Sequence, residues 1–471
     1  MINLEKIFKN KIIQAGSWYT ISNFLSKGLV FLTLPIFTRL LSTEDYGLVS
    51  LYTAWLSIFT IIIGLGLNES IRRARFEYET RLDEFVSSIT FLSILLFCTF
   101  LVFIYIFESF FMKITQLSQT LLYLMIFQAF FTYIQNLAMT KFQVNYNYKT
   151  VASLNIITAL VSTISSIVLI IYIFQGDNYL GKIIGDWVVK FFIGMGIIFI
   201  FLKNGKKFIR IEYWKYSLIL GVPLVFHGLG LILNVQFDRI IINKYVGASA
   251  NGIYSFAYQI GMIIQVLFLS IDQAWNPWFF EKFKDGEYKI IKSRANIVRN
   301  VFTTLYCAVL MLSPEIVRLF SSSEYWSGLD VVPLIFISYY FMFMYTFEVN
   351  VEYGNKKTHL IAAGTLLSAV INIILNLIFV PVYGYIAAAI TTIISYYLLF
   401  LFHYFITSKL LKMPIYGFRF HLKSTIMVIS ITLYFYLFKG SFFMRLIGVF
   451  LSLFLLYLYE AKNLKINNQK I

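Results

Sequence analysis

Long apolar segments separated by short polar connections run through almost the whole chain. Each segment is close to the roughly 20 residues that an α-helix needs to cross a bilayer, so the pattern predicts transmembrane helices. The last two segments are short and are separated only by Lys439 and Gly440. We therefore expect an all-α integral membrane protein with about fourteen transmembrane helices. The predicted spans are residues 14–36, 46–67, 85–107, 117–138, 151–173, 180–202, 217–240, 250–272, 296–319, 328–350, 360–381, 385–407, 423–438 and 441–459.

The composition supports this interpretation and excludes several others. Of 471 residues, 59% are hydrophobic and only 13% are charged, whereas a soluble protein carries roughly 25% charge. Fourteen spans of about 20 residues leave room only for short connections and no soluble domain. Cys98 and Cys307 both lie in apolar runs and are expected to be buried hydrophobic residues. The 4 histidines lack metal-ligand spacing, so neither a metal site nor another cofactor is expected.

The positive charges alternate along the chain and predict its orientation. The formal net charge is +16; 29 of the 39 Lys and Arg residues fall on the side that holds both termini, and 8 fall on the other side. Because cytoplasmic loops are enriched in Lys and Arg, both termini are predicted to be cytoplasmic. Membrane topology and anionic lipids thus explain the basic balance, and no nucleic-acid partner is expected.

Two pairs of short motifs recur at nearly one offset. Residues 39–47 and 244–252 each place a cation eight residues before a glycine, at an offset of 205. Asn-Tyr-Lys-Thr at 147–150 matches Asn-Lys-Lys-Thr at 355–358, at an offset of 208. The offsets indicate duplication of a six-helix unit, and an even number of spans makes the two copies parallel repeats. The predicted parts are 1–210 (spans 1–6), 211–410 (spans 7–12) and 411–471 (an additional helix pair and a cytoplasmic tail).

Charged residues inside predicted spans are candidates for function, because burying a charge in a bilayer is costly. Lys27 lies near the middle of the first span, one turn after Asn23. It either lines a water-filled cavity or pairs with a carboxylate elsewhere in the bundle. Asp186 and Lys190 are four residues apart, which favours an intrahelical ion pair over a substrate site.

Span 7 carries a polar stripe formed by His227, Asn234 and Asp238, followed by Arg239. Spacings of seven and four place the first three on one face of a helix. This face either borders a cavity or forms interhelical hydrogen bonds. Parallel repeats of this kind are typical of transporters, so His227 and Asp238 are candidates for coupling transport to an ion.

Span 8 repeats the arrangement with Tyr258, Gln265 and Asp272 at successive intervals of seven. Asp272 is either a further coupling candidate or a solvated residue near the cytoplasmic surface. Glu348 and Glu352, at the inner end of span 10, are expected to be mostly solvated.

In span 11, Asn372 and Asn376 are one turn apart and either form packing hydrogen bonds or border the cavity. The sequence contains no nucleophile elbow, phosphate loop or paired carboxylate site, and no long external loop. An enzyme is therefore not expected.

Three motifs stand out in the sequence. They are residues 34–47 (LPIFTRLLSTEDYG), residues 252–259 (GIYSFAYQ) after Asp238 and Arg239, and residues 372–376 (NIILN) leading to 381–384 and 387–389. Together they resemble the O-antigen and capsule flippase family (Wzx-type), the polysaccharide-transport branch of the multidrug/oligosaccharidyl-lipid/polysaccharide exporter superfamily. The resemblance covers roughly residues 10–410. Many members of that family have twelve spans, which leaves the role of spans 13 and 14 open.

The resemblance implies two six-helix lobes of the multidrug-exporter (MATE) type around a central cavity, and alternating access. It also implies that undecaprenyl-diphosphate-linked oligosaccharide moves from the inner to the outer leaflet of the bacterial cytoplasmic membrane, for O-antigen, capsule or exopolysaccharide synthesis. Expected partners are this lipid-linked substrate, membrane lipids, a coupling ion (H⁺ or Na⁺), a polysaccharide polymerase and a chain-length regulator. Cations such as Lys27 and Arg39 would attract the diphosphate. The alternative is a multidrug or other lipid-precursor exporter of the same superfamily.

Overall fold

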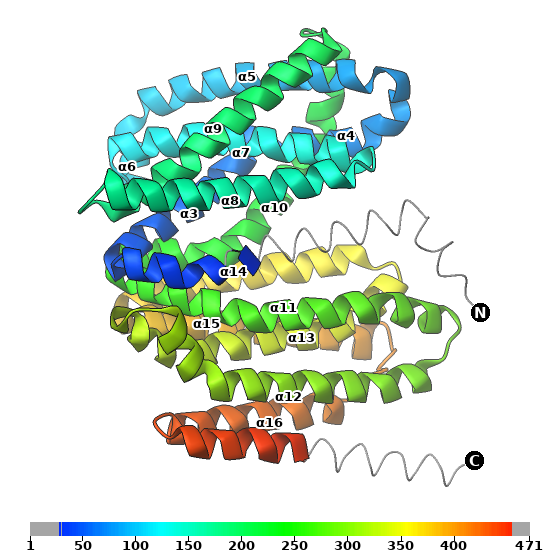
Figure 1. Cartoon of the computed structure of the whole chain (residues 1–471). Coiled ribbons are helices and arrows are strands. Elements are labelled where there is room, and N and C mark those ends of the chain that lie inside the picture. Colours follow the sequence, from blue (N-terminus) through cyan, green and yellow to red (C-terminus); the bar gives the residue numbers. More distant parts are fainter. Residues whose placement is uncertain (1–27, 30, 455–471) are drawn as a thin grey trace. The chain divides into compact units, whose positions relative to one another are not determined.

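The computed structural model describes residues 28–29 and 31–454, and in these ranges every regular element is a helix. Twelve of the described helices are long and apolar enough to cross a membrane, which confirms the predicted all-α membrane fold (Figure 1). Of two shorter apolar helices, Phe442–Phe454 lies within the predicted last span, and Phe31–Leu40 overlaps only the end of the predicted first span. The total of fourteen stays a prediction. Asn23 and Lys27 lie outside the described residues.

The chain divides into two compact units, residues 1–251 and 252–471. The division predicted at residue 210 differs from this, because the helix that begins there packs with the first unit. The helices of the first unit are α3 (Thr43–Gly64), α4 (Leu67–Glu77), η1 (Glu79–Arg81), α5 (Leu82–Ile106), α6 (Glu108–Thr115), α7 (Gln119–Val144), α8 (Tyr148–Tyr172), α9 (Asn178–Gly205) and α10 (Ile211–Tyr245).

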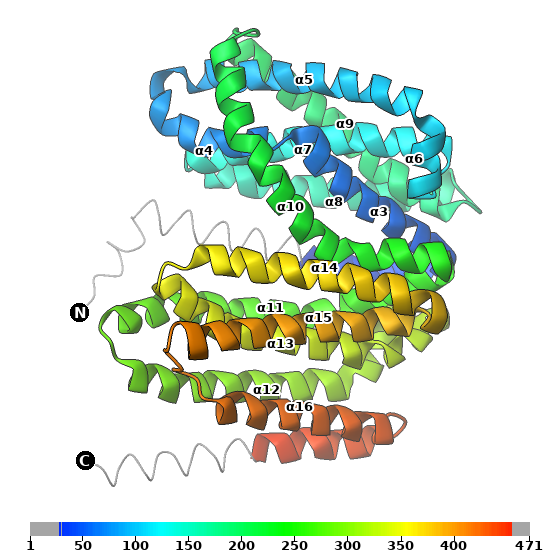
Figure 2. The same cartoon turned by 180° about the vertical axis from the view of Figure 1, so that it is seen from behind.

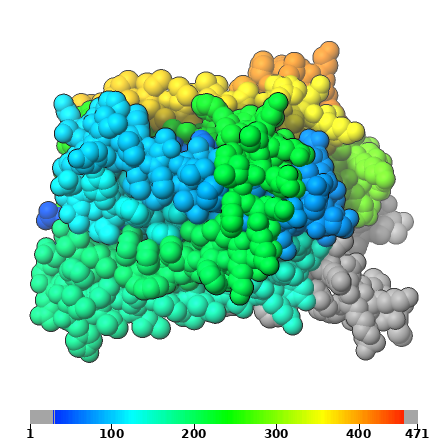
Figure 3. All heavy atoms as spheres, turned by 90° about the horizontal axis from the view of Figure 1, so that it is seen from above, coloured from blue at the N-terminus to red at the C-terminus, as the bar shows by residue number. Residues whose placement is uncertain are grey.

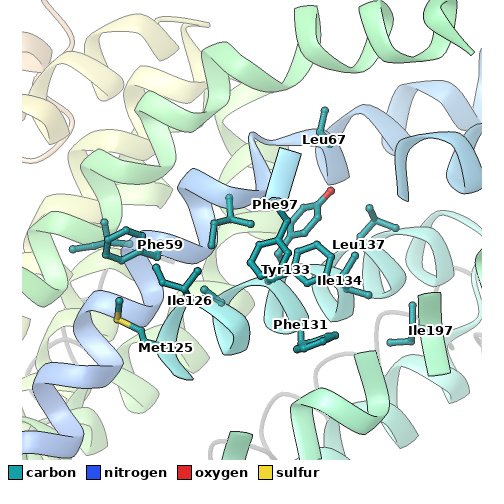
Figure 4. Packing of buried hydrophobic residues seen from close by; sticks show 14 of the residues in the cluster. Phe59, Leu67, Phe97, Met125, Ile126, Phe131, Tyr133, Ile134, Leu137 and Ile197 are labelled. Atoms are coloured by element: carbon teal, nitrogen blue, oxygen red, sulfur yellow. The ribbon is translucent and has the colours of Figure 1, made fainter. Parts of the chain in front are cut away.

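Helix α7 is the centre of the first unit and contacts α3, α4 and α9. Its Met125, Phe131, Tyr133 and Leu137 lie in the main hydrophobic cluster with residues of the neighbouring helices (Figure 4). The hydroxyls of Tyr133 and Ser93 are 3.0 Å apart, which satisfies a polar group inside this apolar layer. The outer helices show the opposite pattern, since large apolar side chains of α8 and α9 remain exposed and suit a lipid-facing surface.

Small residues bring α8 and α9 into close contact. A Cβ atom on Gly185 would lie 2.5 Å from the backbone of Ser166, and one on Gly181 would lie 2.8 Å from the backbone of Ile170. Such glycines at four-residue spacing let membrane helices gain dispersion contacts without a hydrophobic driving force.

Helix α3 corresponds to the predicted second span, 46–67, and ends at Gly64. Both Leu65 and Gly66 adopt left-handed backbone angles, with φ of 43° and 67°. Gly66 has no Cβ and accepts this conformation readily, so the chain turns here and starts the amphipathic helix α4. The connection that the predicted spans leave between residues 67 and 85 therefore contains a helix, which carries Arg72. Helix α10 passes beside α4 and α5 on one face of this unit (Figure 3).

The second unit is built around α13 and α15, which pack against each other, and α14 packs on α15 (Figure 2). Its helices are α11 (Ala248–Lys284), α12 (Tyr288–Phe320), η2 (Ser323–Asp330), α13 (Val332–Gly354), α14 (Thr358–Tyr383), α15 (Tyr385–Phe405), the π-helix η3 (Ile406–Leu410) and α16 (Phe418–Phe438). The first residues of α11 still belong to the first unit.

The additional helix pair packs against α12. The Arg445 guanidinium forms two hydrogen bonds with the Glu315 carboxylate, and the hydroxyls of Tyr306 and Thr432 are 3.0 Å apart. These contacts fasten both the helix Phe442–Phe454 and α16 to the second unit.

Candidate functional site

A polar cavity of about 500 Å³ lies within the first unit, among α4, α7, α8 and α9. This volume is in the range of pockets that bind small molecules. Most side chains around it are polar, and those from α7, α8 and α9 come from otherwise apolar helices. The lining residues are Asn68, Glu69, Arg72, Gln135, Asn136, Met139, Thr140, Gln143, Val151, Asn155 and Lys190.

Helix geometry explains how these residues meet. Gln135, Met139 and Gln143 follow one another at intervals of four along α7 and so share a face. The break at Gly66 places the first turns of α4 beside that face, and Asn68 and Arg72 are four residues apart on α4. The cavity therefore depends on the turn between α3 and α4.

Lys190 supplies a positive charge from α9. Its Nζ donates a hydrogen bond of 3.1 Å to Gln135 Oε1, and Gln135 Nε2 donates to the hydroxyl of Thr158 at 2.9 Å. Among the described residues, no carboxylate oxygen lies within 4.0 Å of this ammonium group. Lys190 is half-buried and is thus a cation whose charge is not matched by an ion pair.

The intrahelical pair expected between Asp186 and Lys190 is wrong. Asp186 Oδ2 instead accepts a 2.6 Å hydrogen bond from Gln128 Nε2, and Gln128 Oε1 accepts one of 2.6 Å from the Tyr52 hydroxyl. The reason is that α7 packs closely on α9. Gln128 of α7 contacts Asp186, and Gln135 of α7 contacts Lys190.

The other two charges of the cavity largely cancel. Arg72 Nε lies 2.8 Å from Glu69 Oε2, and Asn68 Nδ2 donates to Glu69 Oε1 at 2.9 Å. One positive charge therefore remains, on Lys190, among five side-chain amides. Amides both donate and accept hydrogen bonds and suit sugar hydroxyls, whereas an ammonium group attracts an anionic group such as a phosphate.

The residues predicted for the cavity on span 7 lie on α10 and do not line this cavity. His227 is exposed, whereas Asn234, Asp238 and Arg239 are buried. The Arg239 guanidinium donates to the carbonyl oxygen of Val235, one turn earlier, at 2.6 Å. Arg39, at the end of the helix Phe31–Leu40, is exposed, and its guanidinium likewise donates to a carbonyl one turn earlier.

The predicted residues of the second unit form two separate groups. Asn372 and Asn376 are fully buried and hydrogen-bond to each other at 3.1 Å and to hydroxyls of α15. On α11, Tyr258 packs against Tyr339, Gln265 is half-buried, and Asp272 accepts a 2.8 Å hydrogen bond from Asn276. The roles predicted for these residues stay predictions.

The expectation that Glu348 and Glu352 are solvated is wrong, since they are 1% and 0% exposed. Glu348 Oε1 lies 2.7 Å from His421 Nε2, and Glu352 Oε1 lies 2.6 Å from His403 Nδ1. The Thr407 hydroxyl donates to the other oxygen of Glu348. The π-helix after α15 and the start of α16 cover the inner end of α13, and this tertiary packing removes both carboxylates from solvent.

Part of the cavity could have been recognised from the sequence. Gln135, which lines the cavity, is seven residues after Gln128 in an apolar helix, which is the same stripe pattern noted in spans 7 and 8. The contribution of α4 could not, because its residues were assigned to a loop.

Solved structures share this fold. An inward-facing multidrug resistance MATE family transporter of the MOP superfamily superposes with a TM-score of 0.59 at 14% identity, over 91% of this chain and 99% of that one. A MOP superfamily transporter from Pyrococcus furiosus, described as having a binding pocket of reverse polarity, gives a TM-score of 0.50 at 14% identity, over 88% and 93% of the two chains. The protein is thus a multi-pass membrane protein with a MATE-like fold.

Comparison with related sequences identifies the family to which the chain belongs. The family model described as polysaccharide biosynthesis protein matches residues 12–283, more than half of the chain, and the chain belongs to this family. An uncharacterized membrane protein of Haemophilus influenzae is 26% identical over 76% of this chain and 88% of its own length. A probable low-salt glycan biosynthesis flippase of Haloferax volcanii is 21% identical over 80% of this chain and 79% of its own length.

Proposed function

We propose that this protein is a flippase that moves an undecaprenyl-diphosphate-linked oligosaccharide from the inner to the outer leaflet of the bacterial cytoplasmic membrane, with both termini in the cytoplasm. The single observation that carries the proposal is the cavity of the first unit, where the unpaired charge of Lys190 lies among five amides. Membership of the polysaccharide biosynthesis family and the Haloferax relative support the same substrate class.

The chemistry of the substrate explains each part of the cavity. Sugars and a diphosphate cannot enter hydrocarbon without losing their hydration, so they need a polar path. Lys190 attracts the diphosphate as a point charge, and the amides exchange hydrogen bonds with sugar hydroxyls. The polyprenyl chain needs no pocket, because it stays in the bilayer while the head group crosses.

A multidrug exporter of the same superfamily is the competing function. Such a protein would bind amphipathic cations, and a cation is repelled by an unpaired ammonium group in a low-dielectric site. The one remaining positive charge in the cavity therefore favours an anionic substrate over a cationic drug.

The direct test uses purified protein in proteoliposomes that contain a fluorescent polyprenyl-diphosphate-linked oligosaccharide. An impermeant quencher reports how much substrate reaches the outer leaflet. We expect protein-dependent flipping, and we expect Lys190→Met to reduce it, because the methionine retains length but lacks charge.

Lys203→Met is the matched control, since Lys203 is an exposed lysine near the end of the same helix and does not line the cavity. The Lys203→Met protein should flip the substrate at the wild-type rate.

In cells, deletion of the gene should trap completed lipid-linked oligosaccharide in the inner leaflet. Outer-leaflet substrate in the deletion strain at the normal level would refute the flippase function, and a drug-export assay would then be the next measurement.

A further inference from the structure

The second unit contains an acid–base cluster that the proposed substrate cavity does not use. It consists of Glu348 and Glu352 on α13, His403 on α15 and His421 on α16. The four side chains are between 0% and 3% exposed, and each carboxylate contacts one imidazole at 2.7 or 2.6 Å.

Burial makes the charge of this cluster sensitive to single protons. A buried carboxylate is strongly destabilised unless a proton or a cation compensates it. Among the described residues, no Lys or Arg nitrogen lies within 4.0 Å of either carboxylate, so the imidazoles are the neutralising groups. Each pair is neutral with one added proton and carries one negative charge without it.

The unused hydrogen-bonding atoms fit exchange of that proton. Within the described part of the chain, His403 Nε2, His421 Nδ1 and Glu352 Oε2 have no hydrogen-bond partner, although all three are buried. A buried polar atom without a partner costs free energy and calls for a functional explanation. Each histidine thus holds a carboxylate with one ring nitrogen and keeps the other nitrogen available, as a group that passes protons requires.

The cluster also joins α13 to α15, η3 and α16. Glu348 accepts hydrogen bonds from Thr407 in the π-helix η3 and contacts His421 in α16. π-Helical turns are rare and are frequent at functional sites. A proton taken up by the Glu348–His421 pair changes the charge on which these contacts depend, so the bonds from α13 to η3 and α16 depend on protonation.

The charged and titratable groups next to the cluster do not supply its proton or neutralise its carboxylates. Tyr345 of α13 stacks edge-on against His403, and Tyr404 of α15 and Tyr416 contact the ring of His421. Burial and the charge of Glu348 raise the pKa of Tyr416, so this phenol stays protonated. Arg299 of α12 donates to the carbonyl oxygen of Phe420, and Asp272 of α11 accepts from Asn276. The charged residues that η3 and α16 themselves carry, Lys409, Arg419 and Lys423, are exposed.

We propose that Glu348, Glu352, His403 and His421 form a buried proton-binding site in the second unit, and that its protonation drives the transport cycle. The transport part rests on the proposed function, whereas proton binding does not. This site is distinct from His227, Asp238 and Asp272, which the sequence suggested for ion coupling.

Proton binding is tested on purified protein by infrared difference spectroscopy between about pH 5 and about pH 8, where imidazole changes charge. We expect a pH-dependent signal from the buried carboxylate and imidazole groups of the wild-type protein, and we expect Glu348→Gln and Glu352→Gln each to lose part of it. Glu324→Gln is the control, because Glu324 is an exposed carboxylate of the same unit. The proposal is overturned if the wild-type protein shows no such signal, or if a variant that carries both Glu348→Gln and Glu352→Gln keeps it.

Coupling is tested in the proteoliposomes described above, with and without an imposed proton gradient. Wild-type flipping should accelerate in the gradient, whereas Glu352→Gln should flip equally fast with and without it. Gly364→Ala is a second variant, and it keeps every titratable group. The new Cβ would lie 2.4 Å from His403 Nε2 and must displace that ring, so this variant should also lose the acceleration by the gradient.

If the proton gradient still accelerates flipping in both Glu352→Gln and Gly364→Ala, the role of the cluster in coupling is refuted. Absence of flipping in the wild-type protein under every condition refutes the proposed function instead, and the infrared result still decides whether the site binds protons.

Discussion

Replacing Gly66 by alanine is expected to disrupt the cavity without touching any residue that lines it. Gly66 sits between α3 and α4 with a φ of 67°, and its Cβ would lie 2.4 Å from the carbonyl oxygen of Gly221 on α10. Two costs therefore add. The left-handed backbone costs about 1–2 kcal/mol for alanine, and overpacking against a backbone atom costs about 1–3 kcal/mol more.

Gly286→Ala is the matched control for the first cost. Gly286 has a φ of 73°, but nothing lies within 4 Å of the position of its Cβ. Gly286→Ala should therefore lower the free energy of unfolding only by the cost of the left-handed backbone, about 1–2 kcal/mol. Gly66→Ala should lower it by about 2–5 kcal/mol, because both costs apply.

The assay is equilibrium unfolding of each purified variant in detergent micelles, combined with binding of the fluorescent lipid-linked oligosaccharide. We expect Gly66→Ala to weaken binding at least about tenfold, because a shift of α4 moves Asn68 and Arg72, and tenfold corresponds to about 1.4 kcal/mol. Gly286→Ala should bind normally. Equal destabilisation of the two variants, with unchanged binding by both, would refute the close approach of α10 to this turn and its role in shaping the cavity.

Three further substitutions test individual contacts. Gln128→Leu removes the amide that donates to Asp186, and unfolding in detergent should show a loss of about 2 kcal/mol; an unchanged midpoint would contradict the contact. Arg445→Met removes the paired bonds to Glu315, so limited proteolysis should cut the helix Phe442–Phe454 faster than in the wild-type protein, and equal cleavage rates would argue against this anchor. Asn376→Leu should lower the unfolding free energy by only about 1 kcal/mol, which is the usual scale for interhelical hydrogen bonds in membranes, and a normal flipping rate would assign this residue to packing.

Prediction from the sequence succeeded where a local pattern decides the structure. Twelve of the predicted apolar spans correspond to long helices close to their expected positions, because about 20 consecutive apolar residues have few stable alternatives in a bilayer. The failures have tertiary causes. The pairing of Asp186 with Lys190 was inferred from one helix alone, whereas the neighbouring helix α7 supplies Gln128 and Gln135 as competing partners.

The two glutamates of α13 illustrate the same limit. Their position at the end of an apolar run is visible in the sequence, and it indicates solvent. Their burial depends on His403 and His421, which are about 50 and 70 residues away along the chain and are brought over α13 by the packing of α15 and α16.

By itself, the sequence determined that this protein is an all-α membrane protein, and its motifs indicated the polysaccharide-transport family. These properties follow from composition, from the length of apolar segments and from short motifs, all of which are local. Only the tertiary structure decided which polar side chains meet. It placed Lys190 in an amide-lined cavity and enclosed Glu348 and Glu352 with histidines, because hydrogen bonding inside an apolar bundle is decided by the partners that neighbouring helices present.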